Sequence, residues 1–536
     1  MNDDLLSSLN RIHGFSPVCR PFMIGKSPTS LLRQTCLEES TEMKNRMNWK
    51  MMNQVTGSMM LIGCIALSAM GQTLKVGTAE MDITPPNGFP MAGYYHERLA
   101  EGVIDPLKAR AMVFSGNGEK AAMVAMDLCG VTTDLADQIR KGAAEKSGIK
   151  YENIVVSATH SHTSPDYYKT LHDYLAGEKG DAGRIAYVQK LIGNAVAAIE
   201  KADKEVVIAK LAAGSVLQET PVAFNRRFVM KDGSVQTWQS LKSPNVLKSA
   251  GPIDPEIGLV AVKNADGKML GVLSNFALHL DTVGGTRWSG DYPYFIEKSV
   301  RQAHGQGCVS FFGTGCCGDI NHSNPDGSAR NKTDMIGGTL GQTIVGGLEK
   351  LPELKNTRLV VKNTTVKLPL QECGEKEVAE SLAILEALDS GQKVEFLKQV
   401  WAHKMLMIDQ LRHTTPLAAA KAKKPFLRTR KLAGVGEVLP VEVTTIAVGD
   451  DLAIVCLPGE VFVNLGLAIK QNSPYKTTLI VELSNSVETI YIPTRAAHAG
   501  GSYEVTNSTV KPGSGEMLVE AAMGLLRQSR GTSGKP

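Results

Sequence analysis

The sequence predicts an α/β fold in which a mixed β-sheet core is flanked by helices, as a single domain with one helical insertion. From residue 74 onward, short runs of apolar and β-branched residues alternate with helical stretches and Gly/Pro turns. The strands recur too regularly for a helical bundle, and the sequence shows no internal repeat. No Ser/Gly-rich or Pro-rich linker interrupts the region, which favours one domain.

Each predicted strand is a short apolar run between turn residues. These runs are residues 111–114, 121–126, 154–157, 206–216, 257–262, 269–276, 309–312, 358–366, 444–448, 452–457 and 477–483. The predicted helices show apolar residues at helical spacing. They are residues 132–147, 184–204, 294–304, 334–350 and 460–471.

Residues 374–424 break the alternation and form the predicted insertion. The segment opens with a helical run and closes with three alanines and a KAKK cluster ending at Lys424. We interpret it as a helical hairpin or a surface insertion whose charge run is a solvated face.

The N-terminal region has the pattern of an export signal. In residues 43–72, a basic head (Lys44, Arg46, Lys50) precedes an apolar run too short to span a bilayer, followed by small residues. Residues 1–42 would then be an upstream mis-start before Met43 or Met47. We expect cleavage near Gln72 and an exported, periplasmic or extracellular protein without a transmembrane segment. A lipobox-like stretch ending at Cys64 is an alternative that would anchor the chain as a lipoprotein.

Composition limits the classes of partner. The 536 residues are 43% hydrophobic and 5% aromatic, with 58 Lys and Arg against 54 Asp and Glu, which suits a globular chain and gives no strong field. Nucleic acid and anionic membrane surfaces are therefore not expected as partners. Six cysteines lie beyond the signal segment, so disulfides are permitted in an oxidising compartment.

Polar motifs follow several predicted strands. His160 and His162 come two residues apart after residues 154–157, so both side chains can face one cleft. Imidazole is a common ligand of Zn²⁺, although a single His pair is weak support for a metal site. A second strand runs into His279, and a Gly-rich turn then carries Cys316, Cys317 and the stretch from Asp319 to His322.

Two further motifs lie near the C-terminus. Glu460 follows Leu457-Pro458-Gly459, where a carboxylate could simply favour the start of a helix. Tyr491 opens the stretch Tyr491-Ile492-Pro493-Thr494, and a lone tyrosine beside a proline is usually a packing residue. For the vicinal cysteines we favour packed or oxidised thiols over metal ligation.

Taken in order, these motifs resemble the catalytic domain of the neutral ceramidase family, zinc amidases that cleave the N-acyl bond of ceramide. The resemblance begins at residues 77–86, GTAEMDITPP, with the stretch MAGY at 91–94, and extends over residues 75–510. It implies zinc ligands at His160, His279, Glu460 and Tyr491.

The resemblance also assigns residues beyond the metal. His162 falls on the family's second, non-ligand histidine, which suits proton transfer, and Arg226 falls on a motif that would bind or polarise a substrate carbonyl. Asp319 and His322 would line the site. A site of nitrogen and oxygen ligands with room for water is typical of catalytic zinc.

The chain departs from the family at Asn321, where ceramidases carry the catalytic serine of GDVSPN. An Asn amide cannot serve as an acyl-accepting nucleophile. The chain also ends at Pro536, before the C-terminal β-sandwich domain that the family would lead us to expect. Ceramide itself is therefore not assigned as the substrate.

We expect a zinc-dependent hydrolase that cleaves an amide or ester bond of an N-acyl or lipid-like substrate with a metal-activated water. His162 would move the proton, while Arg226, Tyr491 and the Asn321 amide would stabilise the oxyanion. Two alternatives stay open: an inactive, zinc-stabilised secreted binding protein, and a metal-dependent phosphatase or sulfatase. The sequence leaves the oligomeric state, the acyl chain and the redox state of Cys316 and Cys317 undecided.

Overall fold

The computed structural model describes residues 73–178, 180–327, 330–420 and 429–530, and the chain from Gln72 onward forms one compact unit. The predicted mis-start (residues 1–42), the signal segment (43–72), Cys64 and the KAKK cluster lie outside the described residues. Within the described part of the chain, no helix is both long enough and apolar enough to cross a membrane.

The larger of two main sheets has eight strands in the order β14-β12-β11-β6-β1-β3-β4-β5. Their bounds, in that order, are Val309–Thr314, Met269–Phe276, Glu256–Asn264, Val207–Leu217, Lys75–Asp82, Lys108–Gly116, Glu119–Met126 and Ile154–Ala158. The pairs β12·β14 and β4·β5 are parallel and the other pairs antiparallel. Strands β1 and β6 pair over only two residues, so the sheet consists of two four-stranded halves joined at a narrow seam.

The smaller main sheet has the order β16-β17-β18-β20. Its strands are Leu359–Pro369, Val438–Val448, Leu452–Cys456 and Thr477–Val481. Alternating side chains show that the two sheets pack face to face: Met123 of β4 and Ile454 of β18 belong to one buried cluster, whereas their neighbours Val124 and Val455 belong to two others. Central strands such as β4 and β18 therefore bury both faces, which explains why their sequences are almost entirely apolar.

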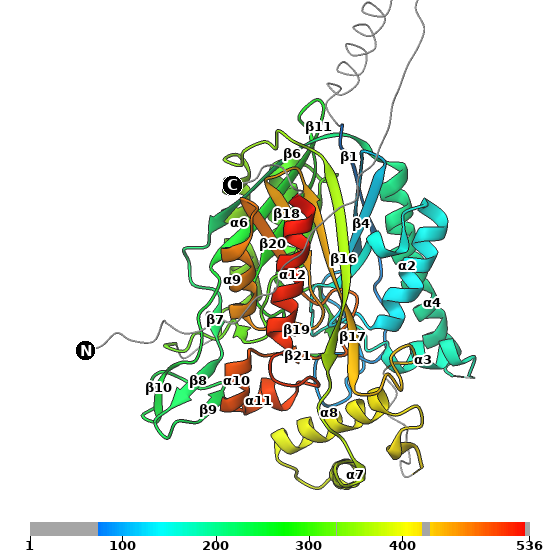
Figure 1. Ribbon diagram of the computed structural model, residues 1–536, viewed down its shortest axis with the longest axis vertical. Coiled ribbons are helices and arrows are strands. Elements are labelled where there is room, and N and C mark those ends of the chain that lie inside the picture. The colour runs from blue at the N-terminus through cyan, green and yellow to red at the C-terminus, as the bar shows by residue number, and fades with distance from the viewer. Residues whose placement is uncertain (1–72, 179, 328–329, 421–428, 531–536) are drawn as a thin grey trace, which may run out of the picture. The chain divides into compact units, whose positions relative to one another are not determined.

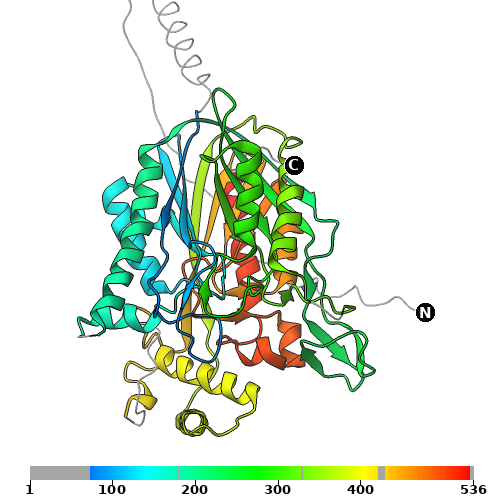
Figure 2. The same ribbon diagram turned by 180° about the vertical axis from the view of Figure 1, so that it is seen from behind.

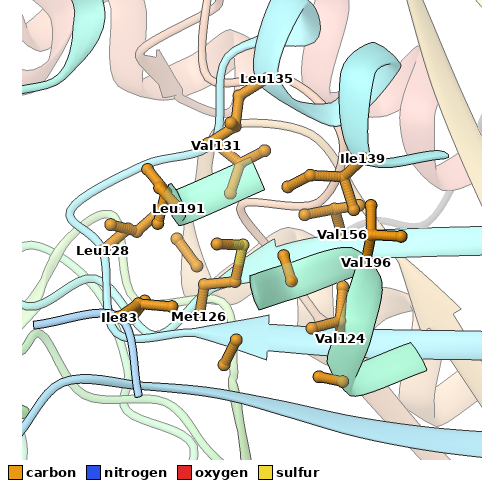
Figure 3. Close-up of a cluster of buried hydrophobic side chains, with 14 of the residues drawn as sticks. Ile83, Val124, Met126, Leu128, Val131, Leu135, Ile139, Val156, Leu191 and Val196 are labelled. Atoms are coloured by element: carbon orange, nitrogen blue, oxygen red, sulfur yellow. The ribbon is translucent and has the colours of Figure 1, made fainter. Parts of the chain in front are cut away.

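Helices cover the two outer faces. One end of the larger sheet carries α2 (Thr133–Ser147), α3 (Tyr168–Ala176) and α4 (Ala182–Lys204), the other end α5 (Tyr292–His304) and α6 (Thr333–Leu348) (Figure 2). The smaller sheet carries α9 (Val463–Asn472) and α12 (Ser514–Arg530). Figure 3 shows how Ile139 of α2 and Val196 of α4 interlock with Val124 and Val156 of the strands.

The predicted fold class is confirmed, and the predicted strands and helices occur with shifts of a few residues at their ends. The structure refines the prediction in two ways. The core contains two stacked sheets, because strands buried on both faces do not reveal in their sequence which sheet covers them. Glu460 does not open a helix: it lies in the short strand β19 (Glu460–Val461), and α9 begins at Val463.

Short ladders and loops gather beyond the ends of the main strands. β19 pairs in parallel with β21 (Tyr491–Ile492), and β15 (Ile320–Asn321) pairs with β7 (Phe224–Asn225). A small sheet has the order β10-β8-β9, with bounds Val246–Ser249, Arg227–Met230 and Val235–Thr237, and β2 (Gly102–Val103) pairs with β13 (Arg287–Trp288). These segments carry most of the predicted site residues.

The insertion is a helical hairpin of α7 (Glu375–Asp389) and α8 (Phe396–Arg412), followed by a short 3-10 turn, Leu417–Ala420. In Figure 1 the hairpin, in yellow, lies beyond the strand ends beside α10 (Arg495–Gly500) and α11 (Ser502–Thr506), and α8 contacts α11. Residues of α8 are largely buried, so the hairpin packs against the domain instead of extending into solvent.

Candidate active site

Four predicted ligands come from three separate parts of the chain. His160 follows β5, His279 follows β12, and Glu460 and Tyr491 lie opposite each other in the β19·β21 ladder. Paired residues of a parallel ladder point to the same side, so these last two side chains share one face. All four are at least 94% buried.

Three ligand atoms converge on one point. The distance from His160 Nε2 to His279 Nε2 is 3.0 Å, and Glu460 Oε2 lies 3.3 Å and 3.4 Å from these two nitrogens. Ligands about 2.0–2.1 Å from a tetrahedral zinc ion stand about 3.3–3.4 Å apart. The two distances to Glu460 match this spacing, and the 3.0 Å between the imidazole nitrogens is somewhat shorter.

The hydrogen bonds behind the two imidazoles fix the direction of their lone pairs. His160 Nδ1 lies 2.6 Å from the Cys129 carbonyl oxygen, and His279 Nδ1 lies 3.0 Å from that of Cys317. A carbonyl only accepts, so each Nδ1 carries the proton and each neutral Nε2 is an acceptor aimed at the other.

This donor set fits a divalent metal ion. Two nitrogen lone pairs face a carboxylate oxygen, Glu460 Oε2, that is buried and lacks a hydrogen-bond donor among the described residues. Such a cluster requires a positive charge. Burial opposes a charged imidazole, yet the Glu460 carboxylate raises the pKa of His160 well above its usual value. A metal ion would supply the same charge without the proton.

The local backbone is shaped around this cluster. His160 has a φ of 80°, a left-handed conformation that costs energy for a residue other than glycine, and its backbone N–H donates to the Leu128 carbonyl. At Gly318, a Cβ atom would lie 2.6 Å from the Glu460 carbonyl oxygen, so only glycine allows the turn after β14 to approach β19.

Arg226 extends the site beyond the ligands. Its Nη2 donates to the Tyr491 hydroxyl at 3.0 Å and to the Gly318 carbonyl at 2.8 Å, while Nε donates to Glu504 at 2.8 Å. Glu504 is fully buried and also pairs with Arg227. Burial and the nearby Glu460 carboxylate raise the pKa of Tyr491 well above its usual value, so its hydroxyl stays protonated.

His162 lies beside the cluster, with Nε2 3.3 Å from His160 Nε2. Burial, and then the neighbouring His160, lower its pKa to about 3, so this imidazole is neutral near pH 7 and can accept a proton. At Gly93, whose φ is 98°, a Cβ atom would lie 2.6 Å from the His162 Cβ, so this glycine makes room for the histidine.

Two adjoining cavities, about 340 Å³ and 330 Å³, open beside these residues. His162, Tyr491 and Tyr503 line both. The first continues past Met91, Met407, Val487 and Ile490 and is largely apolar there. The second continues past Trp238, Phe396, Arg226 and Asp281. Two cavities that meet at this candidate metal site would suit a substrate with two substituents on the bond to be cleaved.

The remaining predicted residues lie near the site but do not line either cavity. Asp319 accepts from Asn225 Nδ2 and the Val463 N–H, and burial raises its pKa to about 6, so it joins β7 to the start of α9. Asn321 Oδ1 accepts from the Ser323 N–H and closes a turn. His322 is buried and pairs with Asp281.

Sequence reasoning missed several lining residues. Tyr503 and Trp238 stand in no motif, and Asp281 follows His279 by two residues, but the sequence indicates no role for it. The α8 residues Phe396 and Met407 lie in the segment interpreted as a helical hairpin or a surface insertion. Apolar residues in a segment that also carries many charges indicate a helix face packed against the domain, and this pattern could have identified them.

Glu482, also missed, supports two ligands from behind. Its Oε2 accepts from the Val461 N–H at 2.6 Å, next to Glu460, and its Oε1 accepts from the Cys317 N–H at 3.1 Å, whose carbonyl orients His279. The Cys317 thiol donates to the same oxygen, and burial raises its pKa well above its usual value, as it does for Cys316. All six described cysteines are free thiols.

Comparisons with known proteins show a family match and a shared fold. Residues 74–333 match the family described as neutral/alkaline non-lysosomal ceramidase, N-terminal. The crystal structure of neutral ceramidase from Pseudomonas aeruginosa is similar, with a TM-score of 0.60, 18% identity, and coverage of 87% of this chain and 76% of that one. A structure of a ceramidase complexed with C2 has a TM-score of 0.61, 17% identity, and coverage of 87% and 77%. At these identities the structural likeness shows a shared fold.

Proposed function

Residues 74–333 belong to the neutral/alkaline non-lysosomal ceramidase family, and from this premise we propose that the protein is a zinc-dependent hydrolase of N-acyl amides. Family membership supports the coarser statement, a ceramidase-like hydrolase acting on amides. The proposal of zinc dependence rests on the convergence of His160, His279 and Glu460, whose ligand atoms face one point. Glu460 Oε2 has no hydrogen-bond donor there among the described residues.

His160, His279, Glu460 and Tyr491 would hold the ion. A bound zinc ion supplies a Lewis acid for the carbonyl and lowers the pKa of a coordinated water to about 7. His162, kept neutral by burial, takes the proton released when the substrate carbonyl is attacked and returns it to the leaving nitrogen.

Arg226 provides the charge for the developing oxyanion. Its Nη1 donates to no acceptor among the described residues, whereas Nη2 and Nε donate to Tyr491, Gly318 and Glu504. The guanidinium is thus rigidly oriented before substrate binds, and such preorganised donors contribute on the order of 10²-fold or more to the rate. Asn321 has no part in this mechanism, because it lines neither cavity.

The test combines metal analysis of the purified protein with a hydrolysis panel of N-acyl amines, N-acyl amino acids and simple esters. We expect about one zinc ion per chain and turnover that chelation abolishes. His160→Ala should lose both. His304→Ala, in a half-buried histidine at the end of α5 that lines neither cavity, should keep both. Bound zinc without any turnover would instead support the binding-protein alternative.

We also propose that the protein is exported, on the pattern of residues 43–72. Expression of the full chain with N-terminal sequencing of the exported product tests this. A mature N-terminus near Gln72 is the expected result. A lipid-modified Cys64 would identify a lipoprotein, and retention of residues 43–72 in the cytosol would contradict export.

A further inference from the structure

The second cavity contains one feature that the proposed reaction leaves unused, the carboxylate of Asp281. It is the single acidic side chain among the described residues lining this cavity, and it is 23% exposed. Its neighbours in the lining are imidazoles, aromatic rings and Arg226, which pairs with the buried Glu504.

Asp281 is held in place from two sides. The His322 ring, which is 2% exposed, donates from Nδ1 to Asp281 Oδ1 at 3.0 Å. The next two residues, Thr282 and Val283, donate their backbone N–H groups to Asp291 Oδ2, each at 3.0 Å. Because Asp291 also caps α5, the loop that carries Asp281 is anchored to a helix. A group fixed in this way is preorganised for a ligand.

The second oxygen of this carboxylate, Oδ2, accepts no hydrogen bond from the described residues, and no ion pair joins Asp281 to a Lys or Arg among them. Arg330 also lines this cavity and has no carboxylate partner among the described residues, but its side chain is exposed. A partly buried carboxylate is costly unless it is paired, and a charge-assisted hydrogen bond from a cation compensates better than one from a neutral donor.

We propose that Asp281 binds a protonated amino group on the amine half of the substrate, so that the enzyme selects N-acyl compounds whose leaving amine carries a second, free amine. This inference rests on the proposed amide hydrolysis. It assigns the first cavity, which is lined in part by Met91, Met407, Val487 and Ile490, to the acyl chain and the second cavity to the amine half. His322 acts as a positioning residue that orients the Asp281 carboxylate.

Four substrates of matched length test the selection: the N-decanoyl amides of putrescine, butanolamine, butylamine and γ-aminobutyrate, which end in an ammonium, a hydroxyl, a methyl group and a carboxylate. We expect kcat/KM for the ammonium compound to exceed that for the methyl compound by about tenfold to a hundredfold, as for a charge-assisted bond. In Asp281→Asn this ratio should fall to about one. In Glu97→Gln, an exposed acid that borders only the first cavity, the ratio should stay at the wild-type value.

Three results would overturn the proposal: equal preference for hydroxyl and ammonium, a ratio unaffected by Asp281→Asn, or an equal loss of turnover on all four amides in that variant. Preference for the carboxylate compound, lost in Arg330→Gln, would assign the cavity to an anion instead. Calorimetric binding of putrescine to wild type and to Asp281→Asn, with folding checked by circular dichroism, is independent of turnover. If no amide is hydrolysed, the proposed function fails, while this binding comparison still decides the role of Asp281.

Discussion

Replacing Glu482 with glutamine tests whether the hydrogen bonds that Glu482 accepts beside Glu460 and behind His279 determine the affinity for a metal ion. In the native chain both carboxylate oxygens accept, one from the Val461 N–H and one from the Cys317 N–H and thiol. A glutamine amide offers only one accepting oxygen. Its NH₂ group would therefore face a backbone N–H, either beside Glu460 or beside the carbonyl that orients His279.

The magnitude follows from that lost acceptor. A buried N–H without a partner costs about 1–3 kcal/mol, and disturbing the groups that orient metal ligands typically costs about 10–100-fold in metal affinity. A factor of 10–100 corresponds to about 1.4–2.8 kcal/mol, the same size. We therefore expect Glu482→Gln to bind zinc about 10–100-fold more weakly than the wild type.

The assay is competition between the metal-stripped protein and a chromophoric zinc chelator. Glu442→Gln is the matched control, since the partly buried Glu442 also accepts from Arg140 and Asn485 but lines neither cavity. It should lose stability and keep the wild-type zinc affinity. A folded Glu482→Gln protein whose zinc affinity lies within about twofold of the wild type would refute the reasoning.

Three further outcomes are expected. Gly93→Ala should lower kcat by at least about tenfold by displacing the adjacent catalytic imidazole, whereas Gly88→Ala, also at positive φ but with open space around a Cβ, should keep its activity; equal losses in steady-state assays would rule out this steric cause. Arg226→Lys and Arg227→Lys both weaken a bond to one buried carboxylate, but only the first should reduce kcat/KM, by about 10²-fold. Equal kinetics for the two variants would remove Arg226 from the mechanism. Burial raises the pKa of Asp105 to about 6 from an unfolded value of about 3.9, so its contribution to the unfolding free energy is present at low pH and lost as pH rises through about 6, by at most about 3 kcal/mol. The difference between wild type and Asp105→Asn in urea unfolding should show this slope, and a flat difference would contradict it.

The sequence predicts the elements well because most strands are short, apolar and bounded by turns. It does not predict how they stack. Met123 and Val124 are equally apolar, yet one faces the second sheet and the other the helices, and nothing local distinguishes the two faces. At Glu460 the sequence prediction is wrong. A carboxylate before an apolar run resembles the start of a helix, but pairing with Tyr491, 31 residues later, places Glu460 in a strand.

For the site, the ordered motifs suffice to nominate His160, His279, Glu460 and Tyr491, and the structure brings these four together. The residues that shape the cavities are different. Trp238 stands in no motif, Asp281 follows His279 without any sign of its role, and Glu482 acts through backbone N–H groups. Their roles therefore depend on contacts between distant segments. Zinc binding, the assignment of site residues and export stay predictions for the experiments above.

The four ligands are spread along the chain from residue 160 to residue 491, and the last two are joined only through the short β19·β21 ladder. During synthesis, a growing chain therefore contains the two histidines but neither Glu460 nor Tyr491 until its final fifth is being made. Two imidazoles alone would hold zinc weakly, so an ion bound by the four proposed ligands would be captured late, after the sheets have stacked. A chain truncated before residue 491 should accordingly not regain hydrolytic activity when zinc is added.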